Sequence, residues 1–211
     1  MMNILNGGRH ANSGLSIQEF MVIPRREQFA ERLRVGAEVF HALQSILGKR
    51  DFPTTVGDEG GFAPRLGDNE KALQAIMEAI AMAGYVPGKD VAIGLDIAAS
   101  EFYDAQTKRY AFQDAETWWT PPQVHALLGK WIATYPLISI EDPFAEDDWD
   151  NWRELTARVG KKTQIVGDDL FVTNVKRLQM GIRKKVGNAI LIKVNQIGSL
   201  TETMRAIALA R

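Results

Sequence analysis

Four short apolar runs stand out in the pattern of hydrophobic and polar positions, and turn-forming residues bound each of them. They read VAIGLDIAA (91–99), PLISIED (136–142), TQIVGDD (163–169) and AILIKVN (189–195). Runs of this length that are rich in β-branched residues are typical of buried β-strands. The pattern therefore predicts four strands between residues 91 and 195.

Helical patterns separate these predicted strands. In residues 120–136, Thr120 is placed to cap a helix, Pro121 takes its first position, and apolar residues recur at helical spacing. Residues 173–187 carry one apolar and one basic face, with Gly187 as a stop. Two longer helices are expected at about 25–48 and 68–84. Strands that alternate with helices through short loops indicate a parallel α/β fold.

Both ends of the chain look like parts of something longer. The opening MMNILNGG is apolar and strand-like. Near the other end, Ser199 and Glu202 form a Ser-x-x-Glu helix start, and the helical pattern continues to Arg211 without a stop signal. We therefore expect the chain to be part of a larger protein.

Composition narrows the classes of function. Lys and Arg number 25 and Asp and Glu number 26, so the near-neutral charge gives no reason to expect nucleic acid or a membrane as a partner. The chain has no cysteine, which excludes disulfides, thiolate metal sites and cysteine nucleophiles. Since no signal peptide or long apolar run is present, we expect a cytoplasmic protein.

Each predicted strand carries a polar residue near its C-terminal end. Taken at alternate positions, Asp96, Glu141, Asp168 and Lys193 fall on the inward faces of four successive strands. In a parallel (β/α) barrel, active sites are built at that end of the strands. A single acid there is more often a helix cap or a solvated loop residue. Three in register, with no thiolate available, favour a site for Mg²⁺ or Mn²⁺.

Lys193 is unusual because the pattern places it in a buried strand. Near a divalent cation its ammonium pKa would fall, which leaves a neutral amine able to act as a base. Such an amine could remove the proton next to a metal-bound carboxylate. The alternative is a lysine whose side chain reaches out from the strand end to water.

Two glycine-rich stretches carry further candidates. TVGDEGGFAP (55–64) holds Glu59, which could donate a proton from a mobile loop, although composition alone favours a plain turn. Residues 6–20 hold His10, followed by Gln18 and Glu19, which we expect to end a short strand. His41 and His125 lie in helical patterns and receive no role.

Seven stretches, in order along nearly the whole chain, closely resemble the enolase (phosphopyruvate hydratase) family. They are MMNILNGGRHA, SIQEFMVIP, VGDEGGFAP, LDIAASEFYD, YPLISIEDPFAEDDWDNW, QIVGDDLFVTN and ILIKVNQIGSLTET. The resemblance implies a hydro-lyase that reversibly dehydrates 2-phospho-D-glycerate to phosphoenolpyruvate in glycolysis, with two Mg²⁺ per active site. It implies that Asp96, Glu141 and Asp168 bind the tighter metal ion and that Lys193 removes the C2 proton.

The resemblance also implies roles that the pattern alone does not establish. Glu59 matches the acid that protonates the departing C3 hydroxyl, and Glu19 matches a carboxylate that assists at the same end of the substrate. Gln18 and His10 match substrate-contacting positions. Asp169, in the family's Gly-Asp-Asp motif, is a weaker candidate.

The implied fold is a partial enolase-type (β/α) TIM barrel over residues 1–211, without the N-terminal α+β domain and the last barrel units. Those parts of the family supply a second-metal ligand, a Ser-His-Arg-Ser phosphate grip and a second lysine. We therefore expect the isolated segment to be inactive and the full-length protein to be a homodimer. The alternatives are another member of the wider superfamily, or a non-catalytic remnant that serves as a binding or scaffold protein.

Overall fold

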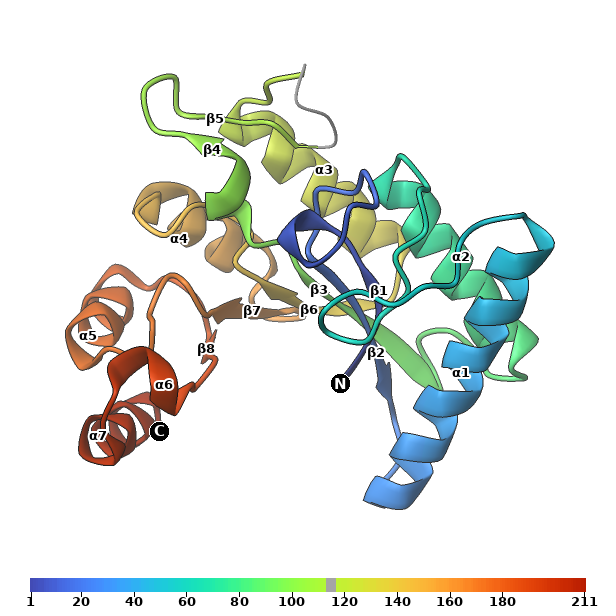
Figure 1. Cartoon of the computed structure of the whole chain (residues 1–211). Coiled ribbons are helices and arrows are strands. Elements are labelled where there is room, and N and C mark those ends of the chain that lie inside the picture. The colour runs from blue at the N-terminus through green and yellow to red at the C-terminus, as the bar shows by residue number, and fades with distance from the viewer. Residues whose placement is uncertain (113–116) are drawn as a thin grey trace.

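The fold is built around one mixed sheet, and the computed structural model describes residues 1–112 and 117–211. Within these residues the main sheet has the strand order β1-β2-β3-β6-β7-β8, and a small second sheet pairs β4 with β5 (Figure 1). The strands are β1 Met2–Asn6, β2 Glu19–Pro24, β3 Val91–Asp96, β4 Tyr103–Asp104, β5 Arg109–Tyr110, β6 Leu137–Glu141, β7 Gln164–Gly167 and β8 Ala189–Ile190.

Helices connect most of these strands. They are α1 Phe29–Lys49, α2 Asn69–Met82, α3 Pro121–Thr134, α4 Trp149–Val159, α5 Val175–Lys184, α6 Val194–Ile197 and α7 Leu200–Ala210, with 3-10 turns η1 Gly8–His10 and η2 Ala99–Phe102. In Figure 1 the N-terminal pair α1 and α2 and the C-terminal pair α5 and α7 lie at opposite ends of the main sheet. In the described part of the chain, none of the helices has the length and apolar character needed to cross a membrane.

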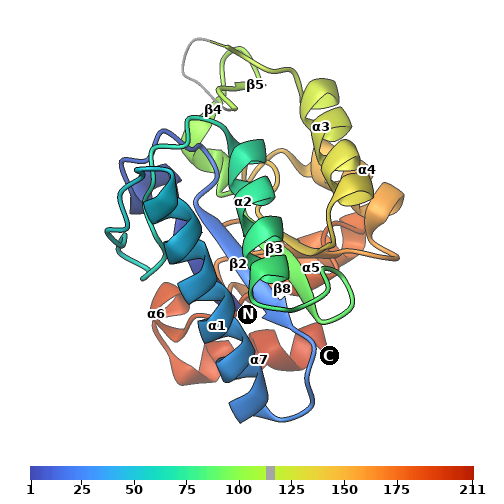
Figure 2. The same cartoon turned by 90° about the vertical axis from the view of Figure 1, so that its right-hand side faces the viewer.

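Helices α1 and α2 cover the strands next to the N-terminus. Val35, Val39 and Leu43 recur every four residues and are fully buried, so α1 presents one apolar stripe to the core. Figure 2 shows α1 and α2 side by side across β2 and β3. These two helices lie close to the ranges predicted from the sequence.

The predicted helix signals are confirmed at three other places. Thr120 and the Gln123 side chain form a capping box at the start of α3. The Ser199 hydroxyl accepts a hydrogen bond from the Glu202 backbone N–H and caps α7. Helix α5 lies within the predicted range 173–187, and Asn174 caps it. Helix α4 was not predicted, although Trp152 and Leu155 stand three residues apart and are both buried.

The expectation of a parallel sheet holds for the part between β3 and β8. Strands β3, β6, β7 and β8 pair in parallel in that order. The first two strands differ, because β1 pairs antiparallel with β2 and β2 pairs antiparallel with β3. A short irregular connection with the 3-10 turn η1 joins β1 to β2, and helices α1 and α2 join β2 to its antiparallel neighbour β3.

The last predicted strand, residues 189–195, is wrong beyond its second residue. Strand β8 ends at Ile190, and Val194–Ile197 form the short helix α6. The Lys193 backbone N–H donates to the Thr173 hydroxyl oxygen at 2.9 Å instead of to a neighbouring strand. Lys193 therefore follows the strand rather than lying in it, and its side chain is 44% exposed.

Candidate active site

Three acidic residues lie side by side across three neighbouring strands. Glu19 is opposite Asp96 in the β2–β3 ladder, and Asp96 is opposite Glu141 in the β3–β6 ladder. The backbone N–H of Ile97 donates to the Glu141 carbonyl oxygen at 3.0 Å and extends this pairing past the strand. The acids meet where the parallel strands β3 and β6 end, which is the end at which the sequence predicted the site.

Glu19 reaches this cluster in a way that the sequence analysis did not predict. We expected Gln18 and Glu19 to end a short strand, but Glu19 is the first residue of β2. Because β2 runs antiparallel to β3, its N-terminal end meets the C-terminal end of β3. The antiparallel direction thus places the first residue of β2 beside the last residue of β3.

The buried acids disfavour each other's ionised forms. Asp96 and Glu141 are 6% and 8% exposed. Burial raises the pKa of Asp96, and the neighbouring charge of Glu19 adds to this effect. Burial raises the pKa of Glu141 to about 9, with the charge of Asp96 as the next cause. Burial also raises the pKa of Glu19, although the nearby His10 opposes that shift.

Asp168 lies one residue beyond β7, and both of its carboxylate oxygens are hydrogen bonded. One oxygen accepts from the Lys193 ammonium at 2.5 Å, and the other accepts from the Gln196 amide at 2.7 Å. Among the described residues, carboxylate oxygens within 4.8 Å of one another group Asp96 and Glu141 with Asp142 rather than with Asp168. The three predicted ligands therefore share one end of the sheet, but Asp168 faces the lysine.

Lys193 carries its charge close to these acids. Burial by itself would lower the pKa of Lys193, but the hydrogen bond to Asp168 and the charges of Asp168 and Glu141 outweigh that effect. The pKa of Lys193 therefore lies above its ordinary value, and the ammonium form is favoured. A cation bound among the acids would oppose this effect.

The predicted substrate-contacting residues flank the acids. The Gln18 side-chain amide donates to an Asp96 carboxylate oxygen at 3.1 Å. His10 Nδ1 lies 3.6 Å from a Glu19 carboxylate oxygen and is buried without a hydrogen-bond partner. Gln18 therefore contacts Asp96, and His10 lies next to Glu19.

The loop at 55–64 brings Glu59 to the same place. Its Phe62 exchanges backbone hydrogen bonds with Ile4 and Asn6 at 3.0 and 2.8 Å, which holds the loop against β1. Gly61 permits this approach, since an added Cβ would lie 2.7 Å from the Leu5 backbone nitrogen. Ligand atoms of His10, Glu19 and Glu59 lie within 4.8 Å of one another, and Glu59 is exposed.

One residue of the site was missed in the sequence analysis. Asp142 directly follows Glu141, is 2% exposed, and groups both with Asp96 and Glu141 and with Asp168 and Asp169. The rule of alternate positions assigned it to the opposite face of the strand. The signal that could have found it is the pair of adjacent acids that closes the run PLISIED.

Comparison with known proteins agrees with this arrangement. Residues 1–211 match the family described as the enolase C-terminal TIM barrel domain. The chain belongs to the enolase family. It is 53% identical over 212 aligned residues to a protein named Enolase from Bdellovibrio bacteriovorus, and the match covers all of this chain and 49% of that protein. The chain thus spans about half the length of the curated relative that it matches.

The sheet is open although the family's domain is a barrel, because the chain matches only 49% of the relative's length. The family's domain is a TIM barrel, and the described residues form a sheet that runs from β1 to β8 without closing. The chain is therefore a partial enolase-type barrel, as the sequence analysis predicted. The acids lie at the strand ends that face the active site in such barrels.

The residues present suit a hard divalent cation. Asp96, Glu141 and Asp142 offer oxygen atoms within 4.8 Å of one another, and all three are buried. Burial raises the pKa of Asp142 well above its ordinary value, as it does for the other two. A group of buried carboxylates lacks positive charge of its own, and oxygen ligands of this kind are those that Mg²⁺ prefers.

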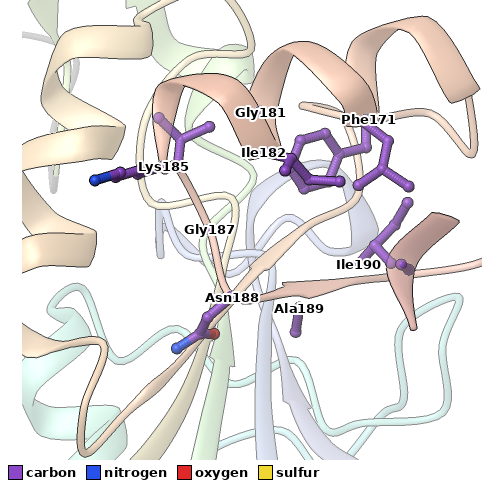
Figure 3. Close-up of a pocket in the computed structure, with 11 residues that line it drawn as sticks. Phe171, Gly181, Ile182, Lys185, Gly187, Asn188, Ala189 and Ile190 are labelled. Atoms are coloured by element: carbon purple, nitrogen blue, oxygen red, sulfur yellow. The ribbon is translucent and has the colours of Figure 1, made fainter.

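A separate pocket of about 230 Å³ lies between α5, α7 and β8. In Figure 3, Phe171, Ile182 and Ile190 point into it from three different segments. None of the acidic residues at the strand ends lines this pocket. It belongs to the end of the sheet that is open in this chain and is not part of the candidate active site.

Proposed function

We propose that this chain supplies the metal-binding and proton-transferring part of an enolase active site. The reaction is the reversible, Mg²⁺-dependent dehydration of 2-phospho-D-glycerate to phosphoenolpyruvate, a lyase step of glycolysis and gluconeogenesis. The observation that carries the proposal is the register that aligns Glu19, Asp96 and Glu141 on adjacent strands, with Lys193 paired to Asp168 at the same strand ends.

Asp96, Glu141 and Asp168 are the residues that would hold Mg²⁺. Their carboxylates come from three consecutive parallel segments, and Gln18 and Lys193 already hydrogen bond to two of them. Bound there, Mg²⁺ would supply positive charge that stabilises a substrate carboxylate when the proton on the adjacent carbon leaves. The resemblance implies two ions per site, and the residues of this chain account for the ligands of one.

Two groups near Glu19 would move the protons. The Lys193 amine takes the C2 proton, and the Glu59 carboxylic acid donates a proton to the C3 hydroxyl, which leaves as water. The charges of both Lys193 and Glu59 affect the pKa of Glu19, which supports the proposal that the three residues act at one site. His10, close to Glu19, would contact the same end of the substrate.

We further propose that these 211 residues alone do not turn over the substrate. The chain covers about half of the relative's length, and β8 has only β7 as a partner among the described strands. A barrel that stays open exposes an unpaired strand edge and lacks the groups that would hold the phosphate. In the full-length protein we propose a cytoplasmic homodimer that acts without nucleic acid or membrane.

The test compares the 211-residue chain with a full-length protein that carries it. Formation of phosphoenolpyruvate from 2-phosphoglycerate is followed by ultraviolet absorbance with and without Mg²⁺. We expect Mg²⁺-dependent turnover by the full-length protein only. A folded full-length protein without turnover would favour a binding or scaffold role. Turnover by the short chain in proportion to its concentration would refute its proposed inactivity.

A further inference from the structure

Asp142 is a buried carboxylate that is not among the three residues proposed to hold Mg²⁺. It is 2% exposed and stands directly after Glu141 at the end of β6. Burying an acid is costly unless its oxygens find donors, and this cost favours a specific function for the group. Asp142 finds such donors in the backbone of the loop that follows β7.

The two carboxylate oxygens of Asp142 accept hydrogen bonds from the backbone of the loop that follows β7. One oxygen accepts a hydrogen bond from the Asp168 backbone N–H at 3.1 Å, and the other accepts from the Asp169 backbone N–H at 2.8 Å. Two adjacent N–H groups on one carboxylate fix the direction in which that backbone turns. The side chain of Asp168 leaves from this fixed segment.

The main chain of Asp142 joins the same elements. Its N–H donates to the Val166 carbonyl oxygen in β7 at 3.0 Å, and its carbonyl oxygen accepts from the Ala99 N–H, just after β3, at 3.1 Å. Asp142 therefore contacts the ends of the strands that carry Asp96 and Asp168, and it is covalently joined to Glu141.

The backbone of Asp142 is in the left-handed region, with φ of 41°. Non-glycine residues rarely adopt this conformation, and it persists only where surrounding contacts demand it. The turn lets Asp142 point toward the same cluster as Glu141, although the two residues are adjacent in sequence. A strict alternation of faces would have separated them.

We propose that Asp142 is a positioning residue that fixes Asp168 and Asp169 relative to Asp96 and Glu141, so that the acids can converge on a divalent cation. This inference rests on the proposed function. Outer residues that orient the ligands of a metal site commonly affect its affinity about 10–100-fold. Asp142 acts through backbone N–H groups, so part of its effect is measurable without any metal.

The test uses Asp142→Gly and Asp142→Asn in the 211-residue chain, with Mn²⁺ as the probe. Glycine adopts the left-handed backbone without strain, so Asp142→Gly removes the carboxylate without straining the turn. We expect Mn²⁺ affinity, measured by calorimetry, to fall about 10–100-fold. We expect amide hydrogen exchange of Asp168 and Asp169 in the metal-free chain to rise about tenfold, because each amide loses its acceptor.

Asp142→Asn should give an intermediate effect on metal affinity and amide exchange. It also replaces the glycine variant if that variant does not fold. Its amide keeps one acceptor oxygen, so faster exchange at only one of the two amides and a smaller loss of affinity are expected. The matched control is Asp150→Asn, the same chemical change at an exposed position. This control should leave both readouts unchanged.

Two outcomes would overturn the inference. One is unchanged exchange of Asp168 and Asp169 in the Asp142 variants, and the other is Mn²⁺ affinity equal to that of the unmodified chain. A merely structural role would lower the thermal midpoint and leave the affinity of the folded fraction intact. Failure of the unmodified chain to bind Mn²⁺ would count against the proposed function, whereas the amide exchange would still decide the role of Asp142.

Discussion

The acid side and the lysine side of the candidate site are built differently. Glu19, Asp96 and Glu141 sit in one continuous ladder of β2, β3 and β6, and β3 has a paired strand on each side. Lys193 follows the two-residue strand β8, which pairs only with β7 in the described part of the chain. The acids Asp96 and Glu141 are buried, whereas the Lys193 side chain is 44% exposed.

This difference predicts that metal binding and proton transfer depend on different parts of the site. A ladder holds each residue by backbone hydrogen bonds, so the acid side is shaped before any ligand arrives. Lys193 is held by a Thr173 hydroxyl and by its own ion pair with Asp168. We therefore expect changes on the acid side to alter stability and metal affinity, and changes on the lysine side to alter turnover.

The largest effect is expected from Lys193→Met in the full-length protein. Loss of a general base commonly lowers turnover about 10²–10⁴-fold. The Lys193 side chain is 44% exposed and Asp168 keeps the Gln196 amide as a donor, so we expect the free energy of unfolding to change by only about 0–1 kcal/mol. Steady-state kinetics and urea unfolding measure the two quantities.

Lys176→Met, an exposed change on α5, is the control for that experiment and should leave turnover unchanged. Turnover by the Lys193→Met protein within about tenfold of the unmodified protein would mean that Lys193 is not the base. A large loss of stability would show that the two sides of the site are not separable.

A smaller effect is expected from pH on the metal-free chain. Glu141 has an ordinary pKa of 4.5, and burial raises it to about 9 in the folded chain. The folded state therefore holds this proton more tightly than the unfolded state. Stability is present at acid pH and is lost as pH rises from about 4.5 toward about 9. One pKa unit corresponds to about 1.4 kcal/mol, and we expect a loss larger than that.

Urea unfolding with a chelator, over a series of pH values, measures this slope. Glu141→Gln should flatten it because the amide does not titrate, and Mn²⁺ should oppose it in the unmodified chain. Glu27→Gln, at an exposed position, should not change it. If the free energy of unfolding depended on pH equally in the Glu141→Gln chain, Glu141 would not be the group whose buried charge destabilises the fold.

The smallest effect compares two helix caps. Asp68 caps α2, which buries seven of its 14 residues, and Ser199 caps α7, which buries only Thr203 and Ala206 of its 11. Removing such a cap with alanine costs about 1 kcal/mol. Asp68→Ala should lower the global free energy of unfolding. Ser199→Ala should mainly speed amide exchange within α7, because that helix can open locally.

Urea unfolding and hydrogen exchange together distinguish the two caps. Equal losses of global stability would show that α7 is as tightly coupled to the sheet as α2. That result would contradict the contrast between the two sides of the molecule.

Local chemistry explains the elements that were predicted correctly. Helices α1, α2, α3, α5 and α7 carry apolar stripes or cap signals within a few residues of one another. Strands β3, β6 and β7 are short apolar runs between turns. Asp96 and Glu141 follow from these strands, because a period of two residues fixes which positions share a face.

The missed features depend on contacts between distant segments. Glu19 lies beside Asp96 because β2 runs antiparallel to β3, and strand direction is not encoded in the apolar pattern of either strand. Asp142 joins the cluster through a left-handed turn that breaks the alternation of faces. Strand β8 ends early where Lys193 bonds to Thr173 instead of a neighbouring strand.

The amino-acid sequence by itself determined where most of the long helices and the central strands form and which strand ends carry acids, because periodicity and capping act within a few residues. It also indicated Lys193 as a candidate base, and it carried the resemblance that implies the role of Glu59. Only the tertiary structure decided which acids face each other, how Glu59 reaches Glu19, and that Asp142 supports the segment that carries Asp168. Those arrangements arise from pairing register and loop packing, which join residues far apart in the chain.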